Sequence, residues 1–239
     1  MKRAALATAS ALSLTAVLTA VLTACSAGDS DAGAKAANSP SSPRAKQASP
    51  EERLAKLLVT KADANYTVTK PVKGDALAAS QEEMRVDKAA CTPLAYATNE
   101  LPIGEPEASL TRVAKNSSSM STYITLATYA DGKAATAMKE LSQATAACTG
   151  GFTAKSDSGS NKYDSVTVET APSGGDESVA AASTFQFRYP QTIRTQTFRF
   201  GDTIANYFTL DVSAFVQSPR PGNAKIPADL VKAQNAKLG

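Results

Sequence analysis

The sequence predicts an α+β domain in which an antiparallel β-sheet is packed against helices. Three observations lead to this fold class. Segments between residues 109 and 216 alternate in polarity and are rich in Thr, Tyr, Phe and Val, which is typical of strands. Segments before, among and after them have apolar residues at helical spacing and recognisable caps. Cys91 and Cys148 fall among these segments and are expected to form one disulfide.

The domain is expected to begin with a helix over residues 49–63. Ser49 is a favourable cap, Pro50 suits the first helical position, and Glu52 completes a capping box. Apolar side chains then recur at helical spacing and would form one stripe facing the core. They are Leu54, Leu57 and Leu58.

Shorter elements are expected before the first long strand. Residues 66–70 alternate like a short strand, and the alanine-rich residues 75–83 indicate a short helix. A further helix over 88–98 carries Cys91. Residues 101–106 contain two prolines and a glycine, so we expect a rigid connector there.

Two strands and one long helix are expected next. Residues 109–115 and 120–129 are predicted strands, separated by a polar turn. A helix is expected from Asp131, as its cap, to Ala147, and the pair Gly150–Gly151 ends it. The buried side of this helix is predicted to be Ala134, Met138, Leu141 and Thr145.

The rest of the sequence predicts antiparallel strands and a final helix. Residues 155–161 are expected to be a polar loop and residues 190–193 a turn. A helix is expected to begin at Pro227 and to reach Leu238. The predicted strands are residues 163–170, 179–189, 194–200 and 203–216.

The register of these strands decides which side chains share a face. Pairing Tyr189 with Arg194 would place four phenylalanines on a common face. They are Phe185, Phe187, Phe198 and Phe200. A two-residue turn at Gly201–Asp202 would add Tyr207 to that face, whereas a one-residue bulge or a three-residue loop would unite all the large apolar groups. The sequence leaves open whether the sheet is apolar on both faces or contains a bulge. Asn206 interrupts an apolar row and indicates a bulge, a buried hydrogen bond or a ligand contact.

The first 24 residues have the organisation of a secretory signal. Lys2 and Arg3 form a basic start, and residues 4–22 are apolar apart from scattered Ser and Thr. The run Leu22-Thr23-Ala24-Cys25 resembles a bacterial lipobox. This resemblance implies lipid on the Cys25 sulfur, cleavage just before it, and a mature chain anchored at the extracellular face of the cytoplasmic membrane. An ordinary secretory signal or an uncleaved anchor helix is the alternative.

Residues 25–48 are predicted to be a flexible tether, because they are mainly Ala, Ser, Gly and Pro. A coil of that length spans roughly 25–30 Å and would hold a single domain, residues 49–239, just clear of the lipid headgroups. Loss of Lys2 and Arg3 lowers the formal net charge of +3 by two, to +1. Such a chain has no electrostatic reason to bind nucleic acid. The expected partners are the membrane, through the lipid anchor, and a small envelope ligand or a protein.

The composition excludes several kinds of catalytic and metal site. Histidine is absent, which removes Ser-His-Asp and Cys-His catalysis and every histidine-based metal site. A Ser-x-x-Lys nucleophile and a phosphate-binding Gly-Lys-Ser/Thr loop are also missing. We therefore expect a binding protein with no catalytic residue, no metal site and no cofactor. The alternatives are an envelope structural or inhibitory protein that acts by surface contact, and a carboxylate-dependent hydrolase.

Once Cys25 carries lipid, two cysteines remain in an oxidising compartment, and a disulfide between them is the default expectation. A Cys91–Cys148 bridge would clip the helix over 88–98 to the end of the helix that closes at Ala147. Two buried free thiols are the alternative.

Three stretches resemble the extracellular sensor domain of the mycobacterial PknH-type serine/threonine kinases, and the secreted lipoproteins that carry this domain alone. They are residues 90–94 (ACTPL), 129–135 (YADGKAA, leading to Cys148) and 198–204 (FRFGDTI). The resemblance covers residues 65–239 and implies an antiparallel sheet with helices packed against it and a cleft that binds a ligand. This sequence contains no kinase domain and no internal transmembrane segment, and it has one cysteine pair where the kinase sensor has two.

Arg188 and Tyr207 are the candidate ligand-binding residues. Arg188, Arg194 and Arg199 flank aromatic residues and would suit an anion- or glycan-facing patch, because guanidinium groups bind carboxylate and phosphate. The alternative is the solvated face of a hairpin. Five tyrosines would either line a cleft or pack in the core, namely Tyr123, Tyr129, Tyr163, Tyr189 and Tyr207. We expect residues 185–200 and the strand through Tyr207 to form one wall of the cleft.

Overall fold

The structure, a computed structural model, describes residues 48–74, 76–216 and 220–239. The predicted signal over residues 1–24, the lipidation site Cys25 and the tether up to residue 47 lie outside the described residues. Residues 46–239 form one compact unit. None of the helices in the described ranges combines the length and the apolarity that crossing a membrane requires.

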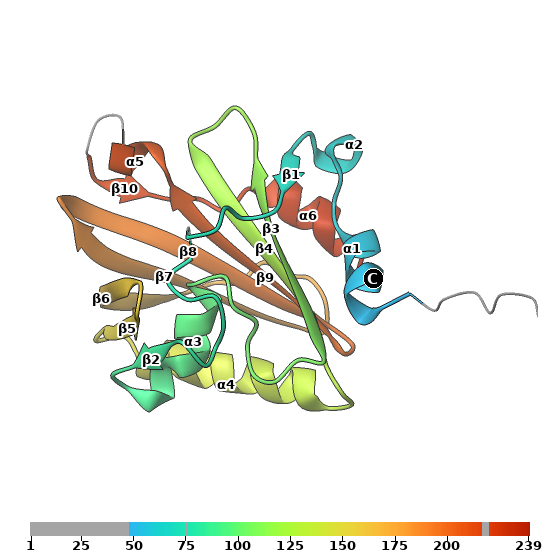
Figure 1. Ribbon diagram of the computed structural model, residues 1–239, viewed down its shortest axis with the longest axis horizontal. Coiled ribbons are helices and arrows are strands. Elements are labelled where there is room, and N and C mark those ends of the chain that lie inside the picture. Colours follow the sequence, from blue (N-terminus) through green and yellow to red (C-terminus); the bar gives the residue numbers. More distant parts are fainter. Residues whose placement is uncertain (1–47, 75, 217–219) are drawn as a thin grey trace, which may run out of the picture. The chain divides into compact units, whose positions relative to one another are not determined.

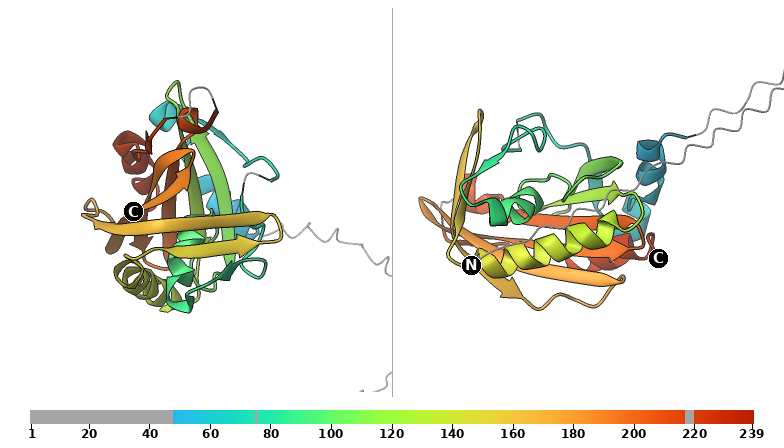
Figure 2. Two further views of the ribbon diagram at one scale, coloured as in Figure 1. Left: turned by 90° about the vertical axis from the view of Figure 1, so that its left-hand side faces the viewer. Right: turned by 90° about the horizontal axis from the view of Figure 1, so that it is seen from below.

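The strands of the described residues form one ten-stranded sheet (Figure 1). Its order is β1-β3-β4-β9-β8-β7-β6-β5-β2, with every neighbouring pair antiparallel, and β10 pairs with β8 in parallel. The sheet is twisted, so that β5 and β6 run across the direction of β3 and β4 (Figure 2). The strands are β1 (Thr67–Thr69), β2 (Arg85–Val86), β3 (Ala108–Lys115), β4 (Met120–Thr128), β5 (Phe152–Ser156), β6 (Gly159–Glu169), β7 (Glu177–Phe187), β8 (Tyr189–Phe200), β9 (Thr203–Asp211) and β10 (Gly222–Asn223).

Helices cover both faces of the sheet, which confirms the predicted α+β class. α1 and α6 pack on one face, the α1/α6 face, and α3 and α4 pack on the other, the α3/α4 face. The helices are α1 (Pro50–Leu57), α2 (Lys61–Ala64), the 3-10 turn η1 (Ala89–Cys91), α3 (Thr92–Ala97), α4 (Lys133–Ala147), α5 (Ser213–Val216) and α6 (Ala228–Asn235).

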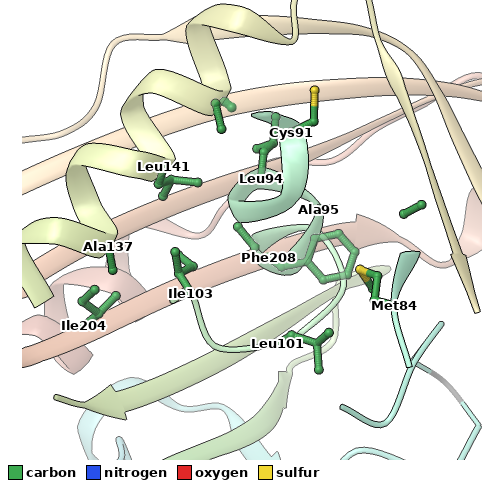
Figure 3. Close-up of a cluster of buried hydrophobic side chains, with 14 of the residues drawn as sticks. Met84, Cys91, Leu94, Ala95, Leu101, Ile103, Ala137, Leu141, Ile204 and Phe208 are labelled. Carbon is green, nitrogen blue, oxygen red and sulfur yellow. The ribbon is translucent and has the colours of Figure 1, made fainter. Parts of the chain in front are cut away.

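The sheet is apolar on both faces, one of the two arrangements that the sequence left open. In β4, Tyr123 belongs to the core on the α3/α4 face and Ile124 to the core on the α1/α6 face. In β9, Phe208 and Tyr207 divide in the same way, because successive side chains of a strand point to opposite faces. Figure 3 shows the core on the α3/α4 face, gathered between α4, α3 and the sheet.

The helix predicted over residues 49–63 is two helices. The capping box at Ser49 is present, with its hydroxyl accepting from a backbone N–H at 3.1 Å. The helix stops at Leu57 because the buried amide of Gln234 in α6 binds the chain there. That amide donates to the Leu57 carbonyl and accepts from the Val59 N–H, both at 2.8 Å. The side chain of Gln234, distant in the sequence, thus takes the place of the backbone hydrogen bonds that would continue the helix.

The long helix α4 agrees with the prediction except at its first residue. All four residues predicted for its buried side are buried. Its cap is Gly132, with φ of 74°, and not Asp131 as predicted. A glycine takes this left-handed conformation without the steric cost that a residue with a Cβ would meet.

The helix predicted over 75–83 is wrong for the residues that are described. Residues 76–83 form bends and turns. Their polar side chains bind backbone groups of the segment itself and of the connector over residues 101–106, which favours turns over a helix. The Glu83 carboxylate accepts from the Ala79 N–H at 2.9 Å, and the Gln81 amide donates to the carbonyls of Pro102 and Gly104 at 2.7 and 2.8 Å.

The polar loop predicted over 155–161 is also wrong, because these residues form the hairpin between β5 and β6. Ser156 pairs with Gly159, and Phe152 pairs with Tyr163 at the other end. The side chains near the turn are mostly exposed. An exposed hairpin end does not show the apolar alternation by which strands are recognised.

The pairing of Tyr189 with Arg194 and the turn at 190–193 are wrong. Phe187 pairs with Tyr189, and Arg188 makes the turn with φ of 56°. Phe185 and Phe187 therefore lie on the α3/α4 face, whereas Phe198 and Phe200 lie on the α1/α6 face. The predicted pairing missed this turn because a non-glycine residue at positive φ is uncommon, and no local feature of the sequence indicated a turn at Arg188.

The turn at Gly201–Asp202 has the two residues considered from the sequence, since Phe200 pairs with Thr203. The last strand is shorter than predicted. β9 ends at Asp211 and is followed by α5, where a strand to residue 216 was expected. Asp211 accepts from the Ser213 hydroxyl at 2.8 Å and from Arg220 at 2.8 Å, which holds the chain in a turn.

Candidate ligand-binding site

A cavity of about 500 Å³ lies on the α3/α4 face of the sheet, beside α5. Six aromatic rings from β4, β6, β7, β9 and α5 line it, together with aliphatic side chains such as Ile193 and Leu210. The aromatic residues are Tyr123, Tyr163, Phe185, Phe187, Phe208 and Phe215. The polar part of the lining comprises Thr98, Asn99, Glu100, Lys115, Ser121 and Asn161.

Strand pairing places the aromatic residues side by side. Tyr123 of β4 pairs with Phe208 of β9, and their rings stack with centroids 5.6 Å apart. Tyr163 of β6 pairs with Phe185 of β7, and these rings meet edge to face at 6.0 Å. Phe215 of α5 stacks on Phe185 at 6.1 Å. The rings thus form an apolar wall with members on four strands and on α5.

The polar wall is built around the buried side chain of Asn99. Its amide nitrogen donates to the Ala95 carbonyl at 2.7 Å and to the Tyr163 hydroxyl at 3.3 Å. Its oxygen accepts from the Asn161 amide at 3.0 Å. Burial raises the pKa of Tyr163, so this hydroxyl stays neutral at physiological pH. Around Asn99 the wall therefore offers neutral amide and hydroxyl groups at fixed positions, beside the charged side chains of Glu100 and Lys115.

Asn206 explains why the segment after α3 lies over the sheet at this point. Its amide donates to the Ala97 carbonyl at 2.9 Å and accepts from Thr197 at 2.8 Å. Thr125 beside it donates to the Glu100 carbonyl at 3.1 Å. Among the readings that the sequence left open for Asn206, the structure shows the buried hydrogen bond. This polar row satisfies the Ala97 carbonyl, which the end of α3 leaves without a helical partner, and the Glu100 carbonyl of the segment that follows.

The described lining contains a single carboxylate, Glu100, and a single ammonium group, Lys115. Glycoside hydrolysis by carboxylates needs two such groups that face each other across the bond to be cleaved. The lining of this cavity therefore does not favour the hydrolase alternative.

The structure does not bring the two predicted ligand-binding residues together. Arg188 is exposed at the tip of the β7–β8 hairpin, 6.0 Å from the centroid of the Phe187 ring. Tyr207 is fully buried on the α1/α6 face, where its hydroxyl donates to Asn235 at 2.6 Å and its ring meets Phe198 edge to face. A ligand contact by either residue stays a prediction, and Tyr207 has the contacts of a core residue.

The remaining arginines and tyrosines are placed as follows. Arg194 pairs with Glu169 at 2.9 Å, and Arg199 pairs with Asp176 and Glu177, which suits the solvated-hairpin alternative for these two. Tyr123 and Tyr163 do line the cavity, as considered from the sequence. The other two tyrosines do not, since Tyr129 donates to the Ile103 carbonyl in the core and Tyr189 is exposed.

Sequence reasoning missed the polar wall and the ring of Phe215. Asn99 and Asn161 are 62 residues apart in the chain and have no local pattern in common. Only the pairing of β6 with β5 and β7, together with the anchoring of the segment after α3, brings them into contact. The one available signal was Asn206, which indicated a buried polar contact without naming its partner.

No protein-family model matches the chain, and no curated protein matches it. Among solved structures, the extracellular domain of PknH from Mycobacterium tuberculosis is similar, with a TM-score of 0.51 and 12% identity over 80% of this chain and 95% of that one. An uncharacterized protein from Mycobacterium smegmatis, the Rv0999 ortholog, has a TM-score of 0.38 and 12% identity over 72% of this chain and 85% of that one. The chain thus shares the fold of the PknH extracellular domain, which confirms the fold that the sequence resemblance implied.

Proposed function

We propose that this chain is a lipoprotein anchored through Cys25 at the extracellular face of the cytoplasmic membrane, and that its domain binds a small envelope ligand without turning it over. The observation that carries the proposal is the cavity of about 500 Å³, which is lined by aromatic rings and by polar groups that include the amides of Asn99 and Asn161. Its volume falls within the range of roughly 300–1,000 Å³ found for small-molecule sites. The fold shared with an extracellular domain supports the location.

The two walls indicate an amphipathic ligand. The rings of Tyr123 and Phe208 would pack on an apolar or planar body, because aromatic side chains bury a large apolar area. Asn99 and Asn161 would orient hydroxyl or amide groups of the same ligand by hydrogen bonds. Glycans with apolar substituents, lipids and short peptides of the envelope have this combination.

Ligand binding is expected to raise the melting temperature of the domain. A ligand that binds only the folded state stabilises it by mass action, by roughly 2.7 kcal/mol at a hundredfold excess over its Kd. Envelope glycans, lipids and peptides would be screened by thermal shift. We expect Phe185→Ala and Asn161→Ala, one in each wall, to reduce the shift by at least half, since each removes a direct contact.

Phe200→Ala is the matched control, because Phe200 is a half-buried phenylalanine on the α1/α6 face and does not line this cavity. Arg188→Ala and Tyr207→Ala test the wall that the sequence predicted. Equal losses in the Phe185 and Phe200 variants would contradict a site in the cavity. Hydrolysis of a bound compound, abolished by one Asp or Glu substitution, would contradict binding without turnover.

The anchoring part of the proposal predicts that Cys25→Ala releases or mislocalises the protein. A diacyl group on Cys25 supplies the two-chain membrane affinity that the polar tether lacks. Cells that express the variant or the unchanged protein would be fractionated, and the protein in each fraction quantified. Equal partition of both into the membrane fraction would show that the lipobox interpretation is wrong.

A further inference from the structure

The tip of the β7–β8 hairpin exposes two aromatic residues on either side of an arginine. Four large apolar side chains are exposed among the described residues, and two of them are Phe187 and Tyr189, at 43% and 45%. Arg188 lies between them and is exposed as well. The other two, Val72 and Val168, are single aliphatic residues in other parts of the fold. Exposed apolar side chains that gather at one point mark a contact surface.

This tip projects beyond its neighbouring strands. The pairing of β8 with β9 begins only at Arg194, and the pairing of β7 with β6 ends at Phe185. Residues 186–190 therefore pair only with each other among the described strands. Figure 1 shows this end of the hairpin at the far left, past the end of β9. A hairpin end that extends past its neighbours can insert into a soft surface.

Within the two strands of the hairpin, the charge near the tip has one sign. Arg188 is the only charged residue between Glu177 and Arg194 in the sequence. The hairpin thus presents a cation and two aromatic rings without a nearby acidic residue of its own strands. Aromatic rings are enriched at the level of lipid headgroups, and a guanidinium group forms charge-assisted hydrogen bonds with phosphate.

The tip is continuous with the cavity. Phe187 lines the cavity and packs on Phe215 of α5, with ring centroids 5.3 Å apart. Phe215 stacks in turn on Phe185 further inside. An apolar path therefore runs from the exposed tip into the cavity.

We propose that the tip formed by Phe187, Arg188 and Tyr189 docks on the surface of an anionic lipid bilayer and sets the rim of the cavity against the membrane. The two rings enter the interfacial region, and the Arg188 guanidinium binds lipid phosphates. Arg188 makes the turn with φ of 56°, a conformation in which glycine or asparagine is favoured, so an arginine at this position carries a backbone cost. This proposal goes beyond ligand binding and holds whether or not the cavity is occupied.

The chain contains no tryptophan, so one substitution provides a unique fluorescent reporter. The compact unit of residues 46–239 with Tyr189→Trp would be mixed with vesicles of phosphatidylcholine and phosphatidylglycerol in equal parts. We expect a blue shift of the emission and quenching by brominated acyl chains. Val168→Trp on β6 is the matched control, because Val168 is 57% exposed but lies outside the tip. Its emission is expected to stay unchanged.

Two further variants test the parts of the tip in the Tyr189→Trp background. Phe187→Ser removes one ring and is expected to weaken binding roughly tenfold, since an aromatic side chain buries a large apolar area. Arg188→Gly relieves the backbone conformation, so the melting temperature is expected to stay the same or rise while vesicle binding weakens. An unshifted Tyr189→Trp emission, as expected if the tip binds a protein partner, would overturn the proposal. An equal shift for Val168→Trp would overturn it as well.

Discussion

Loss of the Cys91–Cys148 disulfide is expected to lower the free energy of unfolding by about 4 kcal/mol in the chain-entropy description of a bridged loop. The two cysteines are 57 residues apart, and both side chains are 1% exposed. The bridge connects η1, at the start of α3, to the residue that ends α4. Without it, the unfolded chain gains the conformational freedom of that loop.

The measurement is urea unfolding of the unchanged protein and of the pair Cys91→Ala and Cys148→Ala. Each single variant is a control, since it also removes the bridge and should lose a similar amount. In the unchanged protein, mass spectrometry after alkylation without reductant should find no free thiol at Cys91 or Cys148. An unchanged urea midpoint in the double variant would contradict the prediction.

Gly151→Ala is expected to destabilise the domain by about 3 kcal/mol or more, because two costs combine. Gly151 has φ of +77°, a conformation that an alanine adopts with strain. A Cβ at this position would lie 2.2 Å from the Tyr163 carbonyl oxygen and 2.7 Å from that of Asp164. Since these are backbone atoms of β6, the strand itself must move, and Tyr163 with it.

The neighbouring glycine provides a matched control. A Cβ added at Gly150 would meet no atom within 4 Å, and the φ of this residue is not positive. Gly150→Ala is therefore expected to change stability by less than about 0.5 kcal/mol. Thermal and urea unfolding of the two variants would be compared, and similar stabilities would contradict the packing described at Gly151. Because Tyr163 lines the cavity, Gly151→Ala is also expected to weaken ligand binding.

Elements with strong local signals could be predicted from the sequence. The capping box at Ser49 and the buried side of α4 depend on residues within a few positions of each other. The disulfide was predicted by elimination, since two cysteines remain once the predicted lipidation of Cys25 is taken into account. Capping interactions and the helical repeat of apolar side chains are set by neighbouring residues, so both can be read from a short stretch of sequence.

Part of the fold and of the site depends on residues that are far apart in the chain. α1 ends where Gln234, 177 residues after Leu57, binds its last carbonyl. The polar wall needs Asn99 to meet Asn161 across 62 residues. No window of the sequence contains both partners of such a contact. The sequence contains every residue involved, but it does not indicate which of them meet, so these contacts could not be predicted from it.

The sequence by itself determined that this chain forms an antiparallel α+β domain with one bridged cysteine pair, because period, caps and composition are local properties. The tertiary structure alone decided the strand register at Arg188, and with it which phenylalanines face the cavity. A shift of one residue in register turns every side chain of a strand to the other face. The turn at Arg188 is supported by contacts such as that of Phe187 with Phe215, which exist only in the folded domain.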